Sequence, residues 1–259
     1  MISLYKVGGN VVDDPQALER FCEEFAALPG PKVIVHGGGV KASQVQKALG
    51  QEPVKIEGRR VTDAATLEVV TMVYAGLCNK DLVARLQKHG CNAIGLAGCD
   101  GSVVTARRRP PKTLSDGVSK VDFGFVGDVT PDSVNVPFIH QLLDAGLVPV
   151  FCAINHDGAG QLLNTNADTM AGAISAALGA KLFYCFEKNG VLCDRNDDSS
   201  VIPSLDPAGY ARLKAEGRVA EGMIPKLDNA FAALRDGACG VVIRNACDLG
   251  TPGGTELKL

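Results

Sequence analysis

Two glycine turns, each directly after an apolar, β-prone segment, are the first residues along the chain whose types and spacing could do chemistry. Gly8-Gly9-Asn10 follows Ile2–Val7, and Gly37-Gly38-Gly39 follows Lys32–His36. Glycine lets backbone amides approach an anion without interference from a Cβ atom, and a helix that begins after such a turn adds partial positive charge. The two turns together predict a phosphate site, whereas either one alone could be only a tight turn.

Lys6 lies inside the first apolar segment, two residues before Gly8. A lysine in such surroundings needs a partner or a path to solvent. Since side chains alternate along a strand, Lys6 and Gly8 face the same side of the sheet. The ammonium group could therefore lie over the first glycine turn as a point charge for a phosphoryl group. The alternative is a lysine at the end of a strand whose tip reaches water.

Polar residues also gather before an alanine-rich helix near the middle of the chain, in the segment Leu163-Asn164-Thr165-Asn166-Ala167-Asp168. Asn166 or Asp168 can cap that helix, because Asn and Asp are preferred at the N-cap position. One cap does not account for the other polar groups. The remaining amides could bind a polar ligand, and a carboxylate could hold lysines in place by charge pairing.

Lys226 is the second lysine in an unusual position, in the first turn of a helix that we expect to begin at Pro225. A cation there opposes the helix dipole, which favours negative charge at the N-terminus. This placement predicts that Lys226 faces an anion, either Asp168 or a phosphate. A solvated surface lysine is the alternative.

The elements that must position these residues alternate between strands and helices. Apolar residues at helical spacing predict a helix over Pro15–Leu28, with Asp13 or Asp14 as its cap, and a second helix ends near Leu49. Further strands are expected at 92–96, 103–107, 147–153, 181–185 and 240–243, and further helices near 65–89, 133–145, 167–178, 207–216 and 225–236. The β-α-β-α order at the start favours an α/β fold with a parallel sheet covered by helices.

The segment from Arg107 to Val126 interrupts this alternation with RRRPPK and then a turn rich in Ser, Gly and Asp. We interpret it as a long hairpin or flap that faces solvent. Gly8-Gly9-Asn10 is expected to be a loop after its strand.

Composition excludes several classes of function. The chain has 259 residues, 46% apolar and 21% charged, as expected of a globular protein. A net charge of -3, 5% aromatic residues and no Trp disfavour nucleic-acid binding. Nine cysteines form no CxxC pair, which argues against zinc sites and disulfide frameworks. The first residues do not form a signal peptide and no apolar run approaches the ~18 residues of a membrane span, so we expect a cytoplasmic protein with no membrane role.

Familiar nucleotide motifs are also absent. The dipeptide Gly-Lys does not occur, which excludes the P-loop pattern, and HGGGVKASQ does not fit the dinucleotide fingerprint GxGxxG. The HRD element of protein kinases is missing. A phosphate site here must use other groups.

Taken in order, the segments of this chain resemble those of the amino-acid kinase family, and most closely its N-acetylglutamate kinase branch. The similar segments run nearly end to end: YKVGGN, VIVHGGG, GRRVTD, NKDLVARLQKHG, GLAGCDG, GFVGDV, LNTNADTMAG, EGMIPK and the closing GGT. The resemblance implies an α/β fold of three layers, an α/β/α sandwich with a mainly parallel central sheet. It also implies one domain with two lobes, in which residues 1–160 bind the acyl amino acid and residues 161–259 bind ATP.

The resemblance further implies roles for individual residues. Lys6 would stabilise the transferring phosphoryl group, Asp168 would orient Lys6 and Lys226, and Lys226 would bridge the ATP phosphates and the leaving group. Arg60 would grip the α-carboxylate of the substrate with help from Asn164, which suits the bidentate pairing of guanidinium with carboxylate. Backbone contacts around the phosphoryl group would come from four glycines: Gly8, Gly9, Gly38 and Gly39.

The implied reaction transfers the γ-phosphoryl group of ATP to the side-chain carboxylate of N-acetyl-L-glutamate, as in arginine biosynthesis. No general base is needed, because that carboxylate is ionised near neutral pH. Mg²⁺ should arrive on ATP, since it often uses substrate phosphates as ligands. We therefore expect no metal ligand from the protein.

The chain departs from the branch in three places. Phe186–Val191 reads FEKNGV where the branch has a segment resembling TDVDGV, so nucleotide contacts should differ. The basic flap is either a solvated hairpin or a feature that meets an acyl group with an extra carboxylate, for instance N-succinylglutamate. The chain begins at its first strand, without the helix that resembles a ring-forming element in arginine-inhibited relatives, so we expect a homodimer without arginine inhibition.

Other functions stay open on the sequence. Within the same fold, a glutamate 5-kinase or a uridylate kinase is possible, although Arg60 and LNTNAD favour the N-acylglutamate substrate. A non-catalytic nucleotide or amino-acid sensor would bind ATP without making an acyl phosphate. An NAD-binding enzyme would rest only on the glycine turns of an α/β fold.

Overall fold

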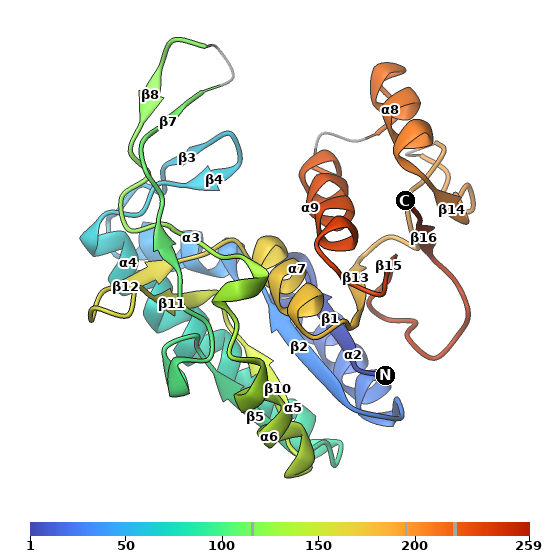
Figure 1. Cartoon of the computed structure of the whole chain (residues 1–259), viewed down its shortest axis with the longest axis horizontal. Helices are drawn as coiled ribbons and strands as arrows, with labels where there is room; N and C mark the ends of the chain where they lie inside the picture. The colour runs from blue at the N-terminus through green and yellow to red at the C-terminus, as the bar shows by residue number, and fades with distance from the viewer. Residues whose placement is uncertain (115–116, 195, 220–221) are drawn as a thin grey trace.

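The structure is a computed structural model that describes residues 1–114, 117–194, 196–219 and 222–259. Its centre is a sheet in the order β14-β16-β15-β13-β1-β2-β10-β5, in which β16 runs antiparallel to β15 and the other pairs are parallel (Figure 1). These strands are β14 Ser204–Leu205, β16 Thr255–Leu257, β15 Gly240–Asn245, β13 Lys181–Phe186, β1 Ser3–Val7, β2 Lys32–His36, β10 Val148–Phe151 and β5 Ala93–Leu96. The expected mainly parallel sheet is confirmed.

Helices cover both faces of this sheet. The helices are α1 Gly9–Asp13, α2 Pro15–Ala27, α3 Gly39–Ala48, α4 Ala64–Thr71, α5 Asn79–Lys88, α6 Val136–Asp144, α7 Ala167–Ala177, α8 Pro207–Ala215 and α9 Ile224–Arg235, with a π-helical segment η1 Met72–Cys78 and 3-10 turns η2 Asp100–Ser102 and η3 Pro131–Ser133. The alternating side chains of the strands divide the core in two.

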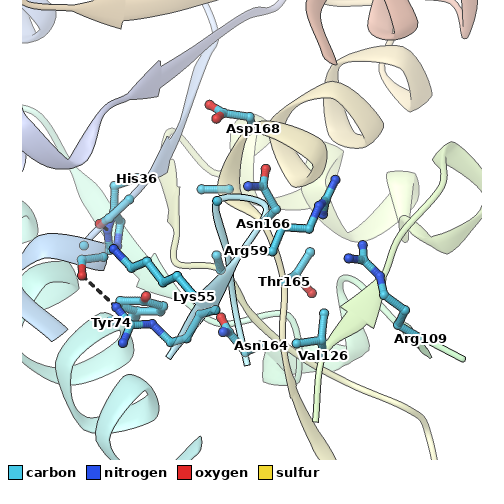
Figure 2. Close-up of a pocket in the computed structure, with 17 residues that line it drawn as sticks. His36, Lys55, Arg59, Tyr74, Arg109, Val126, Asn164, Thr165, Asn166 and Asp168 are labelled. Carbon is cyan, nitrogen blue, oxygen red and sulfur yellow. Dashed lines mark hydrogen bonds between the residues drawn. The ribbon is translucent and has the colours of Figure 1, made fainter. Parts of the chain in front are cut away.

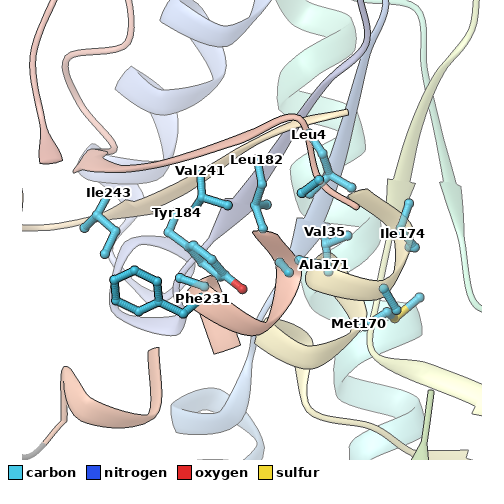
Figure 3. Close-up of a cluster of buried hydrophobic side chains, with 14 of the residues drawn as sticks. Leu4, Val35, Met170, Ala171, Ile174, Leu182, Tyr184, Phe231, Val241 and Ile243 are labelled. Carbon is cyan, nitrogen blue, oxygen red and sulfur yellow. The ribbon is translucent and has the colours of Figure 1, made fainter. Parts of the chain in front are cut away.

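Leu4 of β1 lies in the core cluster that includes residues of α7, α8 and α9, whereas its neighbour Tyr5 lies in the cluster beneath α2, α4 and α5. Figure 3 shows Leu4 and Val35 beside Ala171 and Ile174 of α7 in the first cluster. Burial on two sides explains why the strands read as continuous apolar runs. The expected three-layer α/β/α sandwich is thus confirmed.

Several small hairpins stand apart from the central sheet. They pair β3 Lys55–Ile56 with β4 Arg59–Arg60, β6 Arg107–Arg108 with β9 Gly127–Asp128, β7 Lys112–Thr113 with β8 Lys120–Val121, and β11 Ile154–His156 with β12 Leu162–Asn164. The β6–β9 and β7–β8 pairs confirm the predicted flap. The β3–β4 hairpin extends from the body of the molecule close to the flap (Figure 1).

Three sequence-based expectations for local structure are wrong. The strand expected over 103–107 is absent from 103–106, where Val104 and Thr105 make only isolated bridges, and Arg107 instead begins the short strand β6. The buried β-branched pair Val103-Val104 resembles a strand because it fills the core. The helix expected near 65–89 is divided by η1, and the expected loop after Gly8 begins helix α1 at Gly9.

No helix in the described part of the chain is both long and apolar enough to cross a bilayer.

Candidate functional site

The two glycine turns lie side by side at the carboxyl edge of the sheet. β1 and β2 pair in parallel with Val7 opposite His36, so both strands end at the same level. Gly37 N donates to Val7 O over 3.1 Å, and a Cβ atom built on Gly37 would lie only 3.2 Å from Gly9 N. A side chain at Gly37 would push the turns apart. Glycine is therefore favoured here, because it allows this close backbone approach.

Lys6 points to this edge and is paired there. Its Nζ lies 2.6 Å from Asp168 Oδ1, and the Lys6 side chain is 6% exposed. The alternative of a lysine that reaches water is excluded in the described structure, because Asp168 from α7 neutralises the charge.

Asp168 is free for this pair because its neighbour caps the helix. Asn166 Oδ1 accepts from Thr169 N over 2.9 Å at the start of α7, so the cap left open between the two residues belongs to Asn166. Asp168 then lies in the first turn of α7, where the helix dipole stabilises a negative charge.

Lys226 reaches the same place from the other end of the chain. Helix α9 begins at Ile224, one residue before the predicted start, and Lys226 lies in its first turn. The Lys226 ammonium lies 4.5 Å from the centroid of the Phe186 ring, and the Lys6 ammonium lies 5.6 Å from it. Two lysines that are far apart in sequence thus converge over one aromatic ring, as the interpretation of the sequence requires.

The electrostatics of Lys226 reflect that convergence. Burial lowers the pKa of Lys226, the charge of Lys6 lowers this pKa further, and Asp168 and Glu187 oppose the shift. Only Asp168 of these two carboxylates is in ion-pair contact with either lysine in the described structure, because Glu187 accepts from Asn10 instead, so positive charge exceeds the paired negative charge. Such an excess favours an anion with several negative oxygens, which is the character of a phosphoryl group in transfer.

A cavity of about 200 Å³ opens beside this cluster. Its lining comes from the second glycine turn, the β3–β4 hairpin, the flap and the segment that leads into α7: His36, Gly37, Gly38, Gly39, Lys55, Gly58, Arg59, Arg60, Tyr74, Arg109, Val126, Ala153, Asn164, Thr165, Asn166, Ala167 and Asp168. In Figure 2, Lys55 and Tyr74 lie on one side, Arg109 and Val126 lie on the other, and Asn164, Thr165 and Asn166 lie between them. Arg60, Asn164, Gly38, Gly39 and Asp168, all predicted from sequence, meet in this cavity.

Arg60 is held rigidly in the cavity wall. It is 7% exposed, and its Nη2 donates to Gly39 O and Ser43 Oγ, each over 2.8 Å. Its Nη1 donates to Gln46 Oε1. These contacts join the guanidinium to the second glycine turn and to α3, so Arg60 is positioned before any ligand binds.

Asn164 is also fixed within the site, because its Nδ2 donates to Thr62 Oγ1 over 3.0 Å. A buried amide anchored at one end can offer its other groups to a ligand at a defined position.

His36 lines the same cavity without contributing charge. Its Nδ1 lies 2.7 Å from Gly37 O, and its Nε2 lies 3.0 Å from Asn79 Nδ2. Burial lowers the pKa of His36 to about 4, so the imidazole is neutral at physiological pH. We therefore assign it to the support of the glycine turn.

Sequence reasoning missed Lys55, Arg59, Tyr74 and Arg109 as cavity residues. Lys55 and Arg60 are directly opposite in the β3–β4 hairpin, and Arg59 is the neighbour of Arg60 on β4. The doubled arginine in GRRVTD was the available signal, since it places a second cation directly beside Arg60. The available signal for Arg109 was only its place in the basic flap.

A second cavity, of about 380 Å³, lies beside the ends of β13 and β15. It is lined by Asn189, Val201, Pro203, Arg244, Asn245, Asp248, Gly253 and Gly254. Asn189 in this lining belongs to the segment FEKNGV, which differs from the pattern of the N-acetylglutamate kinase branch. Asn245 Nδ2 donates to Asn189 Oδ1 over 3.0 Å. Glu187 Oε1 also accepts from Asn10 Nδ2 over 3.0 Å, which connects this segment to the first glycine turn.

Residues suited to metal binding do not gather in the described ranges. No group of three or more His, Cys, Asp or Glu side chains there could hold a metal ion.

Comparison with known proteins agrees with the resemblance. Residues 1–245 match the amino acid kinase family. A protein from Bacteroides fragilis called acetylglutamate kinase is 48% identical over 261 residues, which cover 99% of this chain and 97% of the relative. The solved structure of smu.665 from Streptococcus mutans UA159 is 26% identical, with a TM-score of 0.77 over 99% of this chain and 98% of that one.

A third comparison concerns the fold alone. An N-acetylglutamate synthase from Neisseria gonorrhoeae, complexed with coenzyme A and N-acetyl-glutamate, has a TM-score of 0.80 at 22% identity. This similarity covers 100% of this chain and 59% of the synthase chain.

Proposed function

The chain belongs to the amino acid kinase family, and from that premise we propose that it is an enzyme that phosphorylates the side-chain carboxylate of N-acetyl-L-glutamate with ATP, in arginine biosynthesis. Relatives of nearly the same length that are called acetylglutamate kinase support this activity. The observation that carries the proposal is the convergence of Lys6 and Lys226 beside Asp168, at the edge where the two glycine turns meet.

The chemistry follows from charge and position. An oxygen of the acceptor carboxylate attacks the γ-phosphorus of ATP, a new O–P bond forms, and the bond from that phosphorus to the β,γ-bridging oxygen breaks. ADP leaves with the electron pair, and no proton has to move because the acceptor is already ionised. The protein supplies alignment and positive charge, which are the main contributions to catalysis of phosphoryl transfer.

We assign the catalytic roles to Lys6 and Lys226, with Asp168 as the residue that positions both. Lys6 would neutralise the transferring group, and Lys226 would bridge it to the leaving phosphates. Backbone amides of the paired turns would contact the same group, from Gly8, Gly9, Gly38 and Gly39. The anion site would depend on the close approach of the two turns, and neither turn alone would form it.

Arg60 and Asn164 are assigned to the α-carboxylate of the acceptor. Both line the cavity next to Asp168, and both are held by neighbouring side chains. A prepositioned guanidinium loses less entropy on binding a carboxylate than a mobile one.

The lobes divide between the two substrates in this proposal. Residues 1–160 would provide most of the acceptor cavity, and residues 161–259 would bind ATP near the second cavity. Mg²⁺ would come with the nucleotide, in keeping with its preference for phosphate oxygens and water. We also propose that the chain is cytoplasmic and forms a homodimer. Met72 and Leu77 on η1 have side chains that are 57% and 51% exposed, and they offer apolar surface to a second copy.

Trapping the product tests this function. The purified chain is incubated with ATP, Mg²⁺ and hydroxylamine, and hydroxamate and ADP are measured with N-acetylglutamate, with free glutamate and without acceptor. We expect equal amounts of hydroxamate and ADP that depend on N-acetylglutamate. ATP binding without hydroxamate would support a sensor, and preference for free glutamate would support a glutamate 5-kinase.

A further inference from the structure

The acceptor cavity holds more positive charge than N-acetylglutamate can neutralise. Four cationic side chains line it: Lys55, Arg59, Arg60 and Arg109. Among the described lining residues the one carboxylate is Asp168, which is engaged with Lys6. Arg109 already has an ion-pair partner, Asp128, which does not line the cavity. Arg109 Nε donates to both carboxylate oxygens of Asp128 over 3.1 Å.

The remaining cations lie in two places. Lys55 is directly opposite Arg60 on the β3–β4 hairpin, so a single α-carboxylate at Arg60 can also serve Lys55. Arg59 alternates to the other face of the same hairpin. Its half-buried guanidinium has no carboxylate within 4.0 Å among the described residues.

The surroundings of Arg59 favour an anion. Burial lowers the pKa of Arg59, and the nearby charge of Arg109 lowers this pKa further, whereas Asp128, Asp168 and Glu57 oppose the shift. Two guanidinium groups close together in a partly buried wall repel each other, and a carboxylate between them relieves that repulsion. A planar guanidinium also suits a carboxylate better than it suits an apolar methyl group.

N-acetylglutamate offers no group for this position. Its side-chain carboxylate must face Lys6 and Lys226, and its α-carboxylate is assigned to Arg60. We infer that Arg59, supported by Arg109, binds a third carboxylate on the acyl group, so that the preferred acceptor is an N-dicarboxylacyl-glutamate of the succinyl type. This inference rests on the proposed function, because it uses the same site and the same phosphoryl transfer.

Three acceptors separate charge from size: N-acetyl-, N-succinyl- and N-succinamoyl-L-glutamate, the last with a neutral amide in place of the extra carboxylate. Turnover of each is measured with wild type, with Arg59→Gln and with the control Arg107→Gln, a flap arginine that is exposed and does not line the cavity. Wild type and Arg107→Gln should favour the succinyl acceptor by about tenfold or more in kcat/KM over the other two, as a charge-assisted hydrogen bond implies.

Arg59→Gln should abolish that preference and lower kcat/KM for the succinyl acceptor much more than for the acetyl acceptor, since the extra contact is made with the succinyl carboxylate. Equal or better use of the acetyl acceptor by wild type would overturn the inference. So would an equal loss with every acceptor together with a raised KM for ATP, which would assign Arg59 to the nucleotide.

Calorimetric titration measures binding of the succinyl and acetyl acceptors without catalysis, so it tests the role of Arg59 independently of the proposed function. Tighter binding of the succinyl compound that is lost in Arg59→Gln supports the inference even if no hydroxamate forms, an outcome in which only the proposed function fails. Hydroxamate formation without any difference in binding or turnover between the acceptors supports the function and contradicts the role of Arg59.

Discussion

Lys6 Nζ and Asp168 Oδ1 lie 2.6 Å apart and join the central strand β1 to the first turn of α7. The pair fixes an ammonium group at the sheet edge where both glycine turns end. It also places a carboxylate close enough to influence Lys226, because Asp168 raises the pKa of that lysine against the effect of burial. One ion pair thus connects the sheet, the capped helix and the second lysine.

Asp168→Asn should lower kcat by at least about tenfold, because a neutral amide does not hold two ammonium groups in position. KM for the acceptor should change less than kcat. Steady-state kinetics of ADP release measure both constants. Asp144→Asn, which changes an exposed aspartate at the end of α6, is the matched control and should behave as wild type. Unchanged kcat in Asp168→Asn would remove the positioning role.

Gly37→Ala should impair phosphoryl transfer by separating the two turns. The added Cβ would lie 3.2 Å from Gly9 N, and a backbone neighbour can yield only by moving its turn. We expect kcat/KM for ATP to fall by roughly tenfold or more, as small displacements of a positioned site do. Gly76→Ala is the control, since a Cβ there would meet nothing within 4 Å. Equal activity in both variants would show that the turns tolerate separation.

The pH profile of kcat/KM for ATP should decline on the alkaline side below pH 10.5. Burial and the charge of Lys6 lower the pKa of Lys226 from that ordinary value, so the free enzyme loses this positive charge earlier than an exposed lysine would. Lys226→Arg keeps the charge and should move the decline to higher pH, whatever its activity at neutral pH. If the normalised pH profiles of wild type and Lys226→Arg superimpose, a group other than Lys226 causes the decline.

Stability should decrease in acid because His36 is buried in its neutral form. Its pKa is about 4 in the folded chain against 6.5 for the ordinary side chain, so the unfolded chain binds the proton more readily. The contribution is complete above about pH 6.5 and is lost as the pH falls toward 4, for a total of about 3 kcal/mol.

Urea unfolding of wild type and His36→Gln between pH 7 and 4 measures this contribution. The free energy of unfolding should fall less steeply in the variant over that range, since other titrating groups are common to both proteins. Parallel curves would mean that His36 is already protonated, or accessible to protons, in the folded chain.

Much of the arrangement can be predicted from particular residues. The position of Lys6 two residues before Gly8 predicts its direction, because strand side chains alternate. The N-terminal position of Lys226 on its helix predicts an anionic neighbour, because the dipole opposes a cation there. Both predictions are local, and the family resemblance supplied the connection between them.

The rest depends on contacts between distant segments. Asn166 caps α7 and Asp168 pairs with Lys6, a division that the local preference for Asn and Asp at the N-cap cannot resolve. Arg59 and Arg109 meet only because two hairpins fold over one cavity. Val103 and Val104 led to the wrong prediction of a strand, because buried β-branched residues have the sequence pattern of a strand wherever they pack in the core.

The most direct test of the central claim is the kcat of Lys6→Ala with ATP, Mg²⁺ and a saturating N-acylglutamate. Loss of one charge contact made in the transition state should lower kcat about a hundredfold, on the order of 3 kcal/mol, with KM for either substrate changed much less. Lys181→Ala, at the opposite end of the sheet beside Ser3, should retain wild-type kcat. A Lys6→Ala enzyme that folds and turns over at a near-normal rate would contradict the account.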